Sequence, residues 1–244
     1  MSVGAEMSLS AREVAERGEL ESKSAEEILQ WALEEFKDKV ALASSFGAED
    51  VVLIDMMVKI NPKARIFTLD TGRLNQETYD VMDKIREKYK ISLEIMFPKT
   101  EAVEQMVRER GMNLFYQSIE NRKLCCGIRK VEPLNRALKT LDAWITGLRR
   151  DQVVTRTAIK KVDVDVDHGG IIKLNPLADW SWQQVLDYVK QHDVPYNVLH
   201  DRGYPSIGCA PCTRAIKPGE DFRAGRWWWE RPEQKECGLH VSEP

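Results

Sequence analysis

The chain has 244 residues, with 36 Lys and Arg against 39 Asp and Glu, so its formal net charge is −3. This length fits one α/β domain with a tail, and the slight acidity argues against a general nucleic-acid or anionic-membrane binder. No apolar stretch approaches the roughly 20 residues of a membrane span, and the N-terminus lacks a signal-peptide pattern. We therefore expect a cytoplasmic protein with no nucleic-acid or membrane partner. The oligomeric state stays open, with a homo-oligomer among the alternatives.

The first half of the chain alternates between helix-like and strand-like segments. A capping box at Ser24–Glu27 predicts a helix from Ala25 to about Lys37. Such alternation predicts a mostly parallel sheet with helices on both faces. The segments predicted after this helix are a strand over Val40–Ala43, a loop over 44–50, a helix to about Lys59, a strand over Arg65–Leu69, a helix over Gln76–Tyr89, a strand over Ile91–Met96 and a helix over Glu101–Arg110.

The second half begins with a long predicted helix over about Asn121–Lys139. A buried strand over Ala143–Thr146 then opens onto a basic loop, and strand ends in such sheets carry ligand loops. From Asp193 onward Pro and Gly are frequent and apolar periodicity fades, which predicts a loop-rich end of the chain. The other elements predicted here are a hairpin over 161–174 with its turn at His168–Gly170, and a helix over Trp182–Gln191.

Five cysteines in a chain without an export signal favour thiol chemistry or metal ligation over a disulfide framework. Cys125 and Cys126 are adjacent on a predicted helix, and Cys209 and Cys212 form one C-x2-C pair. Neighbouring helical residues point about 100° apart, which suits one zinc ion poorly and favours an iron–sulfur cluster. A redox dithiol at Cys209 and Cys212 is the alternative that the spacing leaves open.

Cys237 stands apart from the other four, in a polar segment near the end of the chain. Lys235 and His240 would favour its thiolate, which is the nucleophilic form. Cys237 is therefore a candidate nucleophile on a mobile arm, and an exposed thiol without a role is the alternative. Trp227–Trp229 either packs this arm down or forms a partner surface.

The loop at Ser44–Asp50 follows a predicted strand and precedes a helix, so its small residues could turn backbone N–H groups toward an anion or a nucleotide. An ordinary tight turn is the alternative. Basic residues are frequent in predicted loops and helix ends, either as surface charges or as a converging site for phosphate or sulfate oxygens. They are Arg129, Lys130, Arg149, Arg150, Arg156, Arg214, Lys217, Arg223 and Arg226.

Six motifs in a fixed order carry a resemblance to a known family. They are Ser45–Ala48, Leu69–Arg73, Cys125–Lys130, Thr146–Arg150 followed by Thr155–Arg156, Cys209–Cys212 and Lys235–His240. Together they resemble the assimilatory sulfonucleotide reductases, which reduce adenylylsulfate (APS) or phosphoadenylylsulfate (PAPS). That family is similar in fold to the adenine-nucleotide α-hydrolases of the PP-loop type. Phe46 and Val51 replace a Gly and the Ser of the ATP-cleaving loop.

The resemblance implies a reaction in two stages and a set of site residues. Cys237 would attack the sulfate sulfur and release AMP, and a reduced thioredoxin or similar reductant would then release sulfite. The resemblance assigns the phosphosulfate to Lys130, Arg156, Arg223, Arg226 and His240, and the adenosine to Ser44, Ser45, Leu69 and Gly147, with Phe46, Gly47 and Arg129 in the same substrate-binding set.

The four other cysteines resemble the [4Fe–4S] branch of the family, with Cys125, Cys126, Cys209 and Cys212 as ligands, and this favours APS. A PAPS or dual reductase is the alternative within the family. An ATP-using RNA-thiolation enzyme would need the intact loop, and a non-enzymatic redox sensor would need no adenosine site. The expected organisation is one nucleotide-binding domain over residues 1–229 and a mobile tail over 230–244 that carries Cys237.

Overall fold

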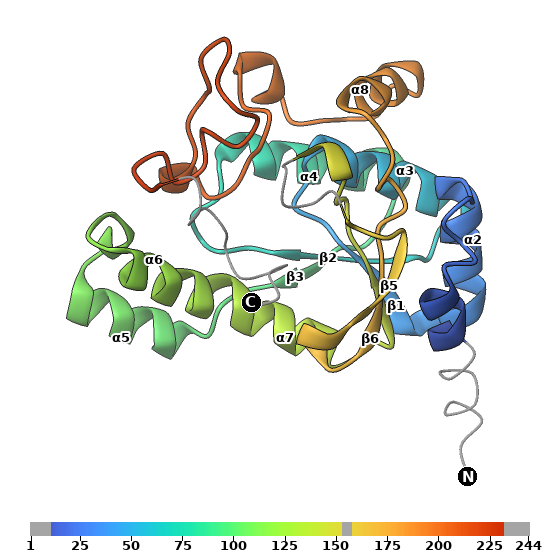
Figure 1. Ribbon diagram of the computed structural model, residues 1–244. Coiled ribbons are helices and arrows are strands. Elements are labelled where there is room, and N and C mark those ends of the chain that lie inside the picture. The colour runs from blue at the N-terminus through green and yellow to red at the C-terminus, as the bar shows by residue number, and fades with distance from the viewer. Residues whose placement is uncertain (1–10, 153–157, 232–244) are drawn as a thin grey trace.

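The computed structural model describes residues 11–152 and 158–231 (Figure 1). Six strands form one sheet in the order β3-β2-β1-β4-β6-β5. All neighbours are parallel except β5 and β6, and Leu42 of β1 pairs with both Ile66 of β2 and Ile145 of β4. The strands are β1 (Val40–Ala43), β2 (Arg65–Leu69), β3 (Glu94–Met96), β4 (Ala143–Ile145), β5 (Val162–Asp165) and β6 (Ile171–Leu174).

The central strands are apolar on both faces, as expected where helices cover both sides of a parallel sheet. Leu42 and Ile145 belong to the larger buried cluster, whereas Ala41, Phe67 and Trp144 belong to a second cluster on the opposite face. Successive residues of a strand point to opposite faces, so each short strand supplies both clusters.

The helices divide between the two faces of the sheet (Figure 1). The larger cluster takes its side chains from α2, α3, α4 and α8, and α7 covers the other face. The helices are α2 (Ala25–Phe36), α3 (Ala48–Ile60), α4 (Gln76–Tyr89), α5 (Thr100–Arg110), α6 (Ile119–Cys126), α7 (Glu132–Leu138) and α8 (Trp182–Gln191), and residues 11–17 are also helical. In the described part of the chain, none of these helices has the length and apolarity that crossing a membrane requires.

The predicted α/β class and mostly parallel sheet are confirmed, and two element predictions are corrected. The strand predicted over Ile91–Met96 contains only Glu94–Met96, because residues 91–93 come before the first pairing with β2. The helix predicted over Asn121–Lys139 is interrupted by a π-helical turn, Gly127–Val131. Pro133 lies in the first turn of α7, and because proline has no N–H to donate to the preceding turn, the regular bonding of one continuous helix is broken there.

The loop-rich segment 193–231 packs beside α4 and over the ends of the strands (Figure 1). The N–H of Ala210 donates to the carbonyl of Arg73 at 2.8 Å, and Asn75 Nδ2 donates to the carbonyl of Gly208 at 3.2 Å. A third apolar cluster joins this segment to α5 and α6, through Met106, Leu114, Phe115, Cys212 and Trp227. These contacts bring the C-x2-C pair to the sheet edge at which β1 and β2 end.

Candidate active site

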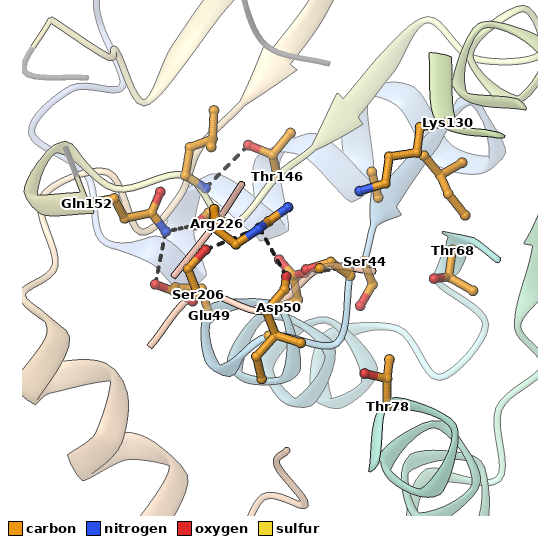
Figure 2. A pocket seen from close by; sticks show the side chains of 18 of the residues that line it. Ser44, Glu49, Asp50, Thr68, Thr78, Lys130, Thr146, Gln152, Ser206 and Arg226 are labelled. Atoms are coloured by element: carbon orange, nitrogen blue, oxygen red, sulfur yellow. Dashed lines mark hydrogen bonds between the residues drawn. The ribbon is translucent and has the colours of Figure 1, made fainter. Parts of the chain in front are cut away.

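A pocket opens at the carboxyl ends of β1, β2 and β4. The sheet order reverses at β1, since β2 lies on one side of it and β4 on the other. Open parallel sheets bind ligands at such a reversal. Figure 2 shows side chains from α3, the loop after β4 and the C-terminal loops meeting around this space. The sequence-predicted site residues that line it are Ser44, Ser45, Gly47, Leu69, Lys130, Gly147, Arg223 and Arg226.

The loop after β1 forms the floor of the pocket. The N–H of Ser44 still donates to the carbonyl of Phe67, which extends the pairing of β1 with β2. Phe46 then adopts the left-handed φ of +58°, and its ring is fully buried in the main core. This conformation is uncommon for an aromatic residue, and the buried ring holds the loop in a fixed shape between β1 and α3.

Asp50 fastens the same loop from within α3. Its Oδ2 accepts hydrogen bonds from the N–H of Ser45 at 2.5 Å and from Ser45 Oγ at 2.8 Å. Burial raises the pKa of Asp50 to about 6, although the hydrogen bonds from Ser45 oppose this rise. The pocket therefore contains a carboxyl group that titrates just below neutral pH.

Gly147 allows the loop after β4 to approach α3 closely. A Cβ atom at this position would collide with Asp50 Oδ1 and would lie 2.9 Å from Glu49 Cβ. Thr146, the preceding residue, donates from Oγ1 to Asn175 Oδ1 at 2.5 Å and fixes the strand end. Only glycine fits at 147, and its backbone forms part of the pocket wall.

A buried ion pair lies behind this wall. Arg149 is fully buried and donates from Nε to Glu49 Oε1 at 2.9 Å, and Gln152 Nε2 donates to the same oxygen at 3.0 Å. The Arg149 guanidinium also lies over the rings of Trp182 and Phe222, at 5.6 and 5.9 Å. Arg149 is thus neither a surface charge nor a pocket cation. It neutralises Glu49 and joins the loop after β4 to the start of α3.

Lys130, Arg223 and Arg226 supply the positive charge of the pocket lining. Lys130 enters from the π-helical turn, on the side away from Gln152 (Figure 2). The Arg226 guanidinium lies directly against the backbone of Gly208, where a Cβ would collide with it, and Nη1 donates to Ser206 Oγ at 3.3 Å. Lys130 comes from the π-helical turn, and Arg223 and Arg226 come from one C-terminal loop. Cations placed on two sides of one space suit an anion with several oxygens.

The four cysteines predicted as ligands form no disulfide and lie near one another and near two cations of the pocket. Burial, then the neighbouring Cys209 and Cys126, raise the pKa of Cys212 to about 12, while Lys130 and Arg226 oppose the rise. Two cations of the pocket lining therefore also interact electrostatically with the cysteine group. Within the described ranges, no three His, Cys, Asp or Glu side chains are arranged so as to hold a metal ion.

The remaining predicted residues lie elsewhere. The Phe46 side chain belongs to the core, and Arg129 is buried beside the cysteines, where its Nη1 donates to the carbonyl of Thr71 at 2.6 Å. The structure therefore does not bring these two side chains to the pocket. Cys237, His240 and Arg156 lie outside the described residues, so their predicted roles stay predictions.

The sequence reasoning missed several pocket residues, among them Thr68, Thr78, Gln152, Ser206 and His200. His200 is largely buried, its pKa is lowered by burial, and its Nδ1 lies 2.8 Å from the carbonyl of Tyr204. A single histidine in a loop gives no signal by residue type or spacing. Thr68 could have been found, since it lies on a strand that ends at the predicted ligand edge.

The fold is that of the PP-loop-like, adenine-nucleotide α-hydrolase class, and the pocket lies at the strand ends where such sheets bind ligands. The FMN adenylyltransferase of Candida glabrata shares the fold, with a TM-score of 0.53 over 98% of this chain and 84% of that one at 13% identity. The phosphoadenylyl-sulfate reductase of Candida auris is more similar, with a TM-score of 0.69 and 33% identity over 80% of this chain and 91% of that one.

Sequence comparison identifies the family within this fold class. Residues 39–215 match the phosphoadenosine phosphosulfate reductase domain. The adenosine 5′-phosphosulfate reductase of Burkholderia cepacia is 54% identical over 84% of this chain and 82% of that protein. The chloroplastic 5′-adenylylsulfate reductase 3 of Arabidopsis thaliana is 48% identical over 93% of this chain and 50% of that protein. The chain belongs to the sulfonucleotide reductase family.

Proposed function

We propose that this protein reduces APS to sulfite and AMP in sulfate assimilation. The observation that carries the proposal is a nucleotide-type pocket in which Lys130, Arg223 and Arg226 face a common space beside four gathered thiols. The relatives named as APS reductases, at about half identity, support APS over PAPS as the substrate.

The first stage is a nucleophilic attack by Cys237. Its thiolate forms a bond to the sulfur of the APS sulfate, the bond from that sulfur to the phosphate oxygen breaks, and AMP leaves with the electron pair. Cys237 then carries an S-sulfonate. The approach of a thiolate to a polyanion is unfavourable in water, so cations fixed around the pocket lower the barrier by stabilising the charge on the leaving phosphate.

The second stage consumes a dithiol reductant such as thioredoxin. One thiolate of the reductant attacks Cys237 Sγ, the bond from Cys237 Sγ to the sulfonate sulfur breaks, and sulfite leaves with the electron pair. The second thiolate of the reductant then attacks its own partner sulfur in the resulting mixed disulfide, which frees the Cys237 thiolate and leaves the reductant as a disulfide. Two electrons pass from the dithiol to the sulfate sulfur. Cys237 must therefore be enclosed in the first stage and accessible in the second, which a short tail beyond residue 231 allows.

We further propose that Cys125, Cys126, Cys209 and Cys212 hold a [4Fe–4S] cluster. The donor type fits this group, because four thiols from two segments lie near one another beside apolar side chains such as Leu124 and Ile128. A four-iron cluster takes its four thiolates at different irons, so it does not need the three side chains around one ion that the described residues lack. Bound there, the cluster would supply negative charge and rigidity. Lys130 and Arg226, which act on Cys212, would balance that charge while facing the substrate.

The experiment is mass spectrometry of anaerobically purified protein incubated with APS or with PAPS, without a reductant. We expect a sulfonate adduct on the Cys237 peptide with APS, and none in Cys237→Ser. Iron and sulfide analysis of the same sample should give about four of each per chain, and Cys209→Ser should lose them.

The outcomes separate the parts of the proposal. Adducts with both nucleotides would leave the chemistry intact and make the enzyme a dual reductase. An adduct on another cysteine would replace Cys237 as the nucleophile. No adduct with either nucleotide, from protein that contains its iron, would overturn the reductase proposal and favour a redox sensor.

A further inference from the structure

Where the described chain ends, the last residues before the tail are held to α6 by a buried ion pair. Arg122 Nε donates to Glu230 Oε1 at 3.0 Å and Arg122 Nη2 donates to Glu230 Oε2 at 2.7 Å. The two side chains are only 1% and 2% exposed. Such a two-point contact fixes both the distance and the direction of the Glu230 carboxylate relative to α6.

Trp227 completes this arrangement. The guanidinium groups of Arg122 and Arg226 both lie over its ring, at 4.9 and 4.7 Å from the centroid, and Trp227 is almost fully buried. The backbone N–H of Trp227 donates to the carbonyl of Cys212 at 3.1 Å, and the φ of Trp227 is +40°. A tryptophan in this left-handed region is strained, so the surrounding contacts must hold it there.

These contacts connect three parts of the molecule that the reaction uses. Arg122 lies one helical turn before Cys126, and Arg226 lines the substrate pocket. The backbone of Trp227 is hydrogen-bonded to the backbone of Cys212. Glu230 lies one residue before the end of the described chain, and Cys237 follows it in the sequence. We call Arg122, Trp227 and Glu230 the tail clamp.

Stability alone does not explain a buried ion pair of this kind. Removing two charges from water is costly, and a well-packed apolar pair often stabilises a fold as well or better. What the pair adds is a fixed geometry, and here that geometry belongs to the origin of the tail. Cys237 lies seven residues beyond Glu230, so an extended chain lets its Cα reach at most about 25 Å from that point.

We propose that the tail clamp is a positioning device that fixes the origin of the tail and so raises the effective concentration of the Cys237 thiol at the pocket. A tether with a fixed origin confines its end group to a smaller volume than one whose base is loose. This inference rests on the proposed function. It assigns the Arg122–Glu230 pair to the sulfonation step and not to nucleotide binding.

The test compares Arg122→Met/Glu230→Met with a matched control, Arg65→Met/Glu94→Met. The control removes another two-point ion pair, at 2.7 and 3.0 Å, which joins β2 to β3 at the sheet end opposite the pocket. Each double variant removes both members of its ion pair together. Three quantities are measured: the single-turnover rate of Cys237 sulfonation at saturating APS, the dissociation constant of AMP, and the urea midpoint.

We expect the clamp variant to sulfonate Cys237 at least tenfold more slowly, with AMP affinity within threefold of wild type and a urea midpoint close to that of the control. A rate within twofold of wild type would overturn the inference. An AMP affinity that falls in proportion to the rate would also overturn it, because the pair would then act on the pocket through Arg226.

A second variant decides the matter if the double variant does not fold. Glu230→Asp keeps the charge and shortens the side chain by one methylene, so we expect at least a threefold slower sulfonation, whereas an unchanged rate would refute the clamp. Wild-type protein that forms no adduct at all would instead overturn the proposed function, and the clamp inference with it.

Discussion

Gly147 shows how a single missing methyl group shapes the pocket. Its Cα approaches α3 so closely that Gly147→Ala must push the loop away from Asp50 and Glu49. We expect AMP to bind at least tenfold more weakly to Gly147→Ala, a loss of about 1.4 kcal/mol, measured by isothermal titration calorimetry. Gly127→Ala is the control for the added methyl group, because a Cβ there meets nothing within 4 Å. Equal AMP affinity in the two variants would contradict the packing argument.

Asp50 gives the fold a specific pH dependence. Its pKa is raised from 3.8 to about 6 in the folded state, so the folded protein binds more protons than the unfolded chain between these values. Stability from this group is therefore lost as pH rises from about 4 to 6, by up to about 3 kcal/mol. Asp50→Asn removes this contribution.

The measurement is urea unfolding of wild type and Asp50→Asn at several pH values. The free energy of unfolding of wild type relative to the variant should fall between pH 4 and 6.5 and then stay level. Other carboxylates, such as Asp55 and Asp165, have lowered pKa values and make both proteins more stable as pH rises. Their contribution is the same in both proteins and drops out when the two free energies of unfolding are subtracted. A difference that rises with pH would show that Asp50 is ionised and stabilised in the folded state.

At the scale of residues, the sequence predicted those site positions that local patterns mark. Ser44, Gly147 and Lys130 stand in short motifs at strand or helix ends, and all three line the pocket. The pairing of Arg149 with Glu49 could not be predicted, because the partners are one hundred residues apart and meet only through the sheet. Arg149 has the same local appearance as an exposed arginine.

At the scale of elements, the Arg149–Glu49 pair holds the loop after β4 against the start of α3. Arg149→Met would leave the Glu49 carboxylate in the pocket wall without its guanidinium partner, and breaking such buried pairs costs about 3–5 kcal/mol. Arg65→Met breaks a half-exposed pair and should cost about 1 kcal/mol or less. Chemical unfolding of both variants measures the contrast, and equal costs would show that the Arg149 pair is not part of the fold's support.

Element boundaries were predictable where caps and apolar periodicity agree. The capping box at Ser24 begins α2 as expected, with Ser24 Oγ accepting from the N–H of Glu27 at 3.1 Å. The π-helical turn at Gly127–Val131 was not predicted, although Pro133 marks in the sequence a place where continuous helical bonding is broken. The turn matters because it adds a residue to the helix and so sets where Lys130 points relative to Cys126.

At the scale of the whole molecule, the apolar clusters of the described residues supply a core to the body of the protein, and we predict that this body folds without residues 232–244. A protein truncated after Arg231 should unfold within about 3 °C of the full chain. It should bind AMP with a dissociation constant within about threefold, yet form no S-sulfonate and release no sulfite.

A synthetic peptide of residues 232–244 tests further whether nucleotide binding and the nucleophile belong to separate parts of the chain. Supplied to the truncated protein with APS, it should become sulfonated on its own cysteine only near millimolar concentration, because a short tether provides an effective concentration of that order. Mass spectrometry of the peptide and thermal unfolding of the protein are the two measurements. Sulfite release by the truncated protein alone would remove Cys237 from the mechanism. An unfolded truncated protein would show that the tail belongs to the fold, since the body would then be incomplete without it.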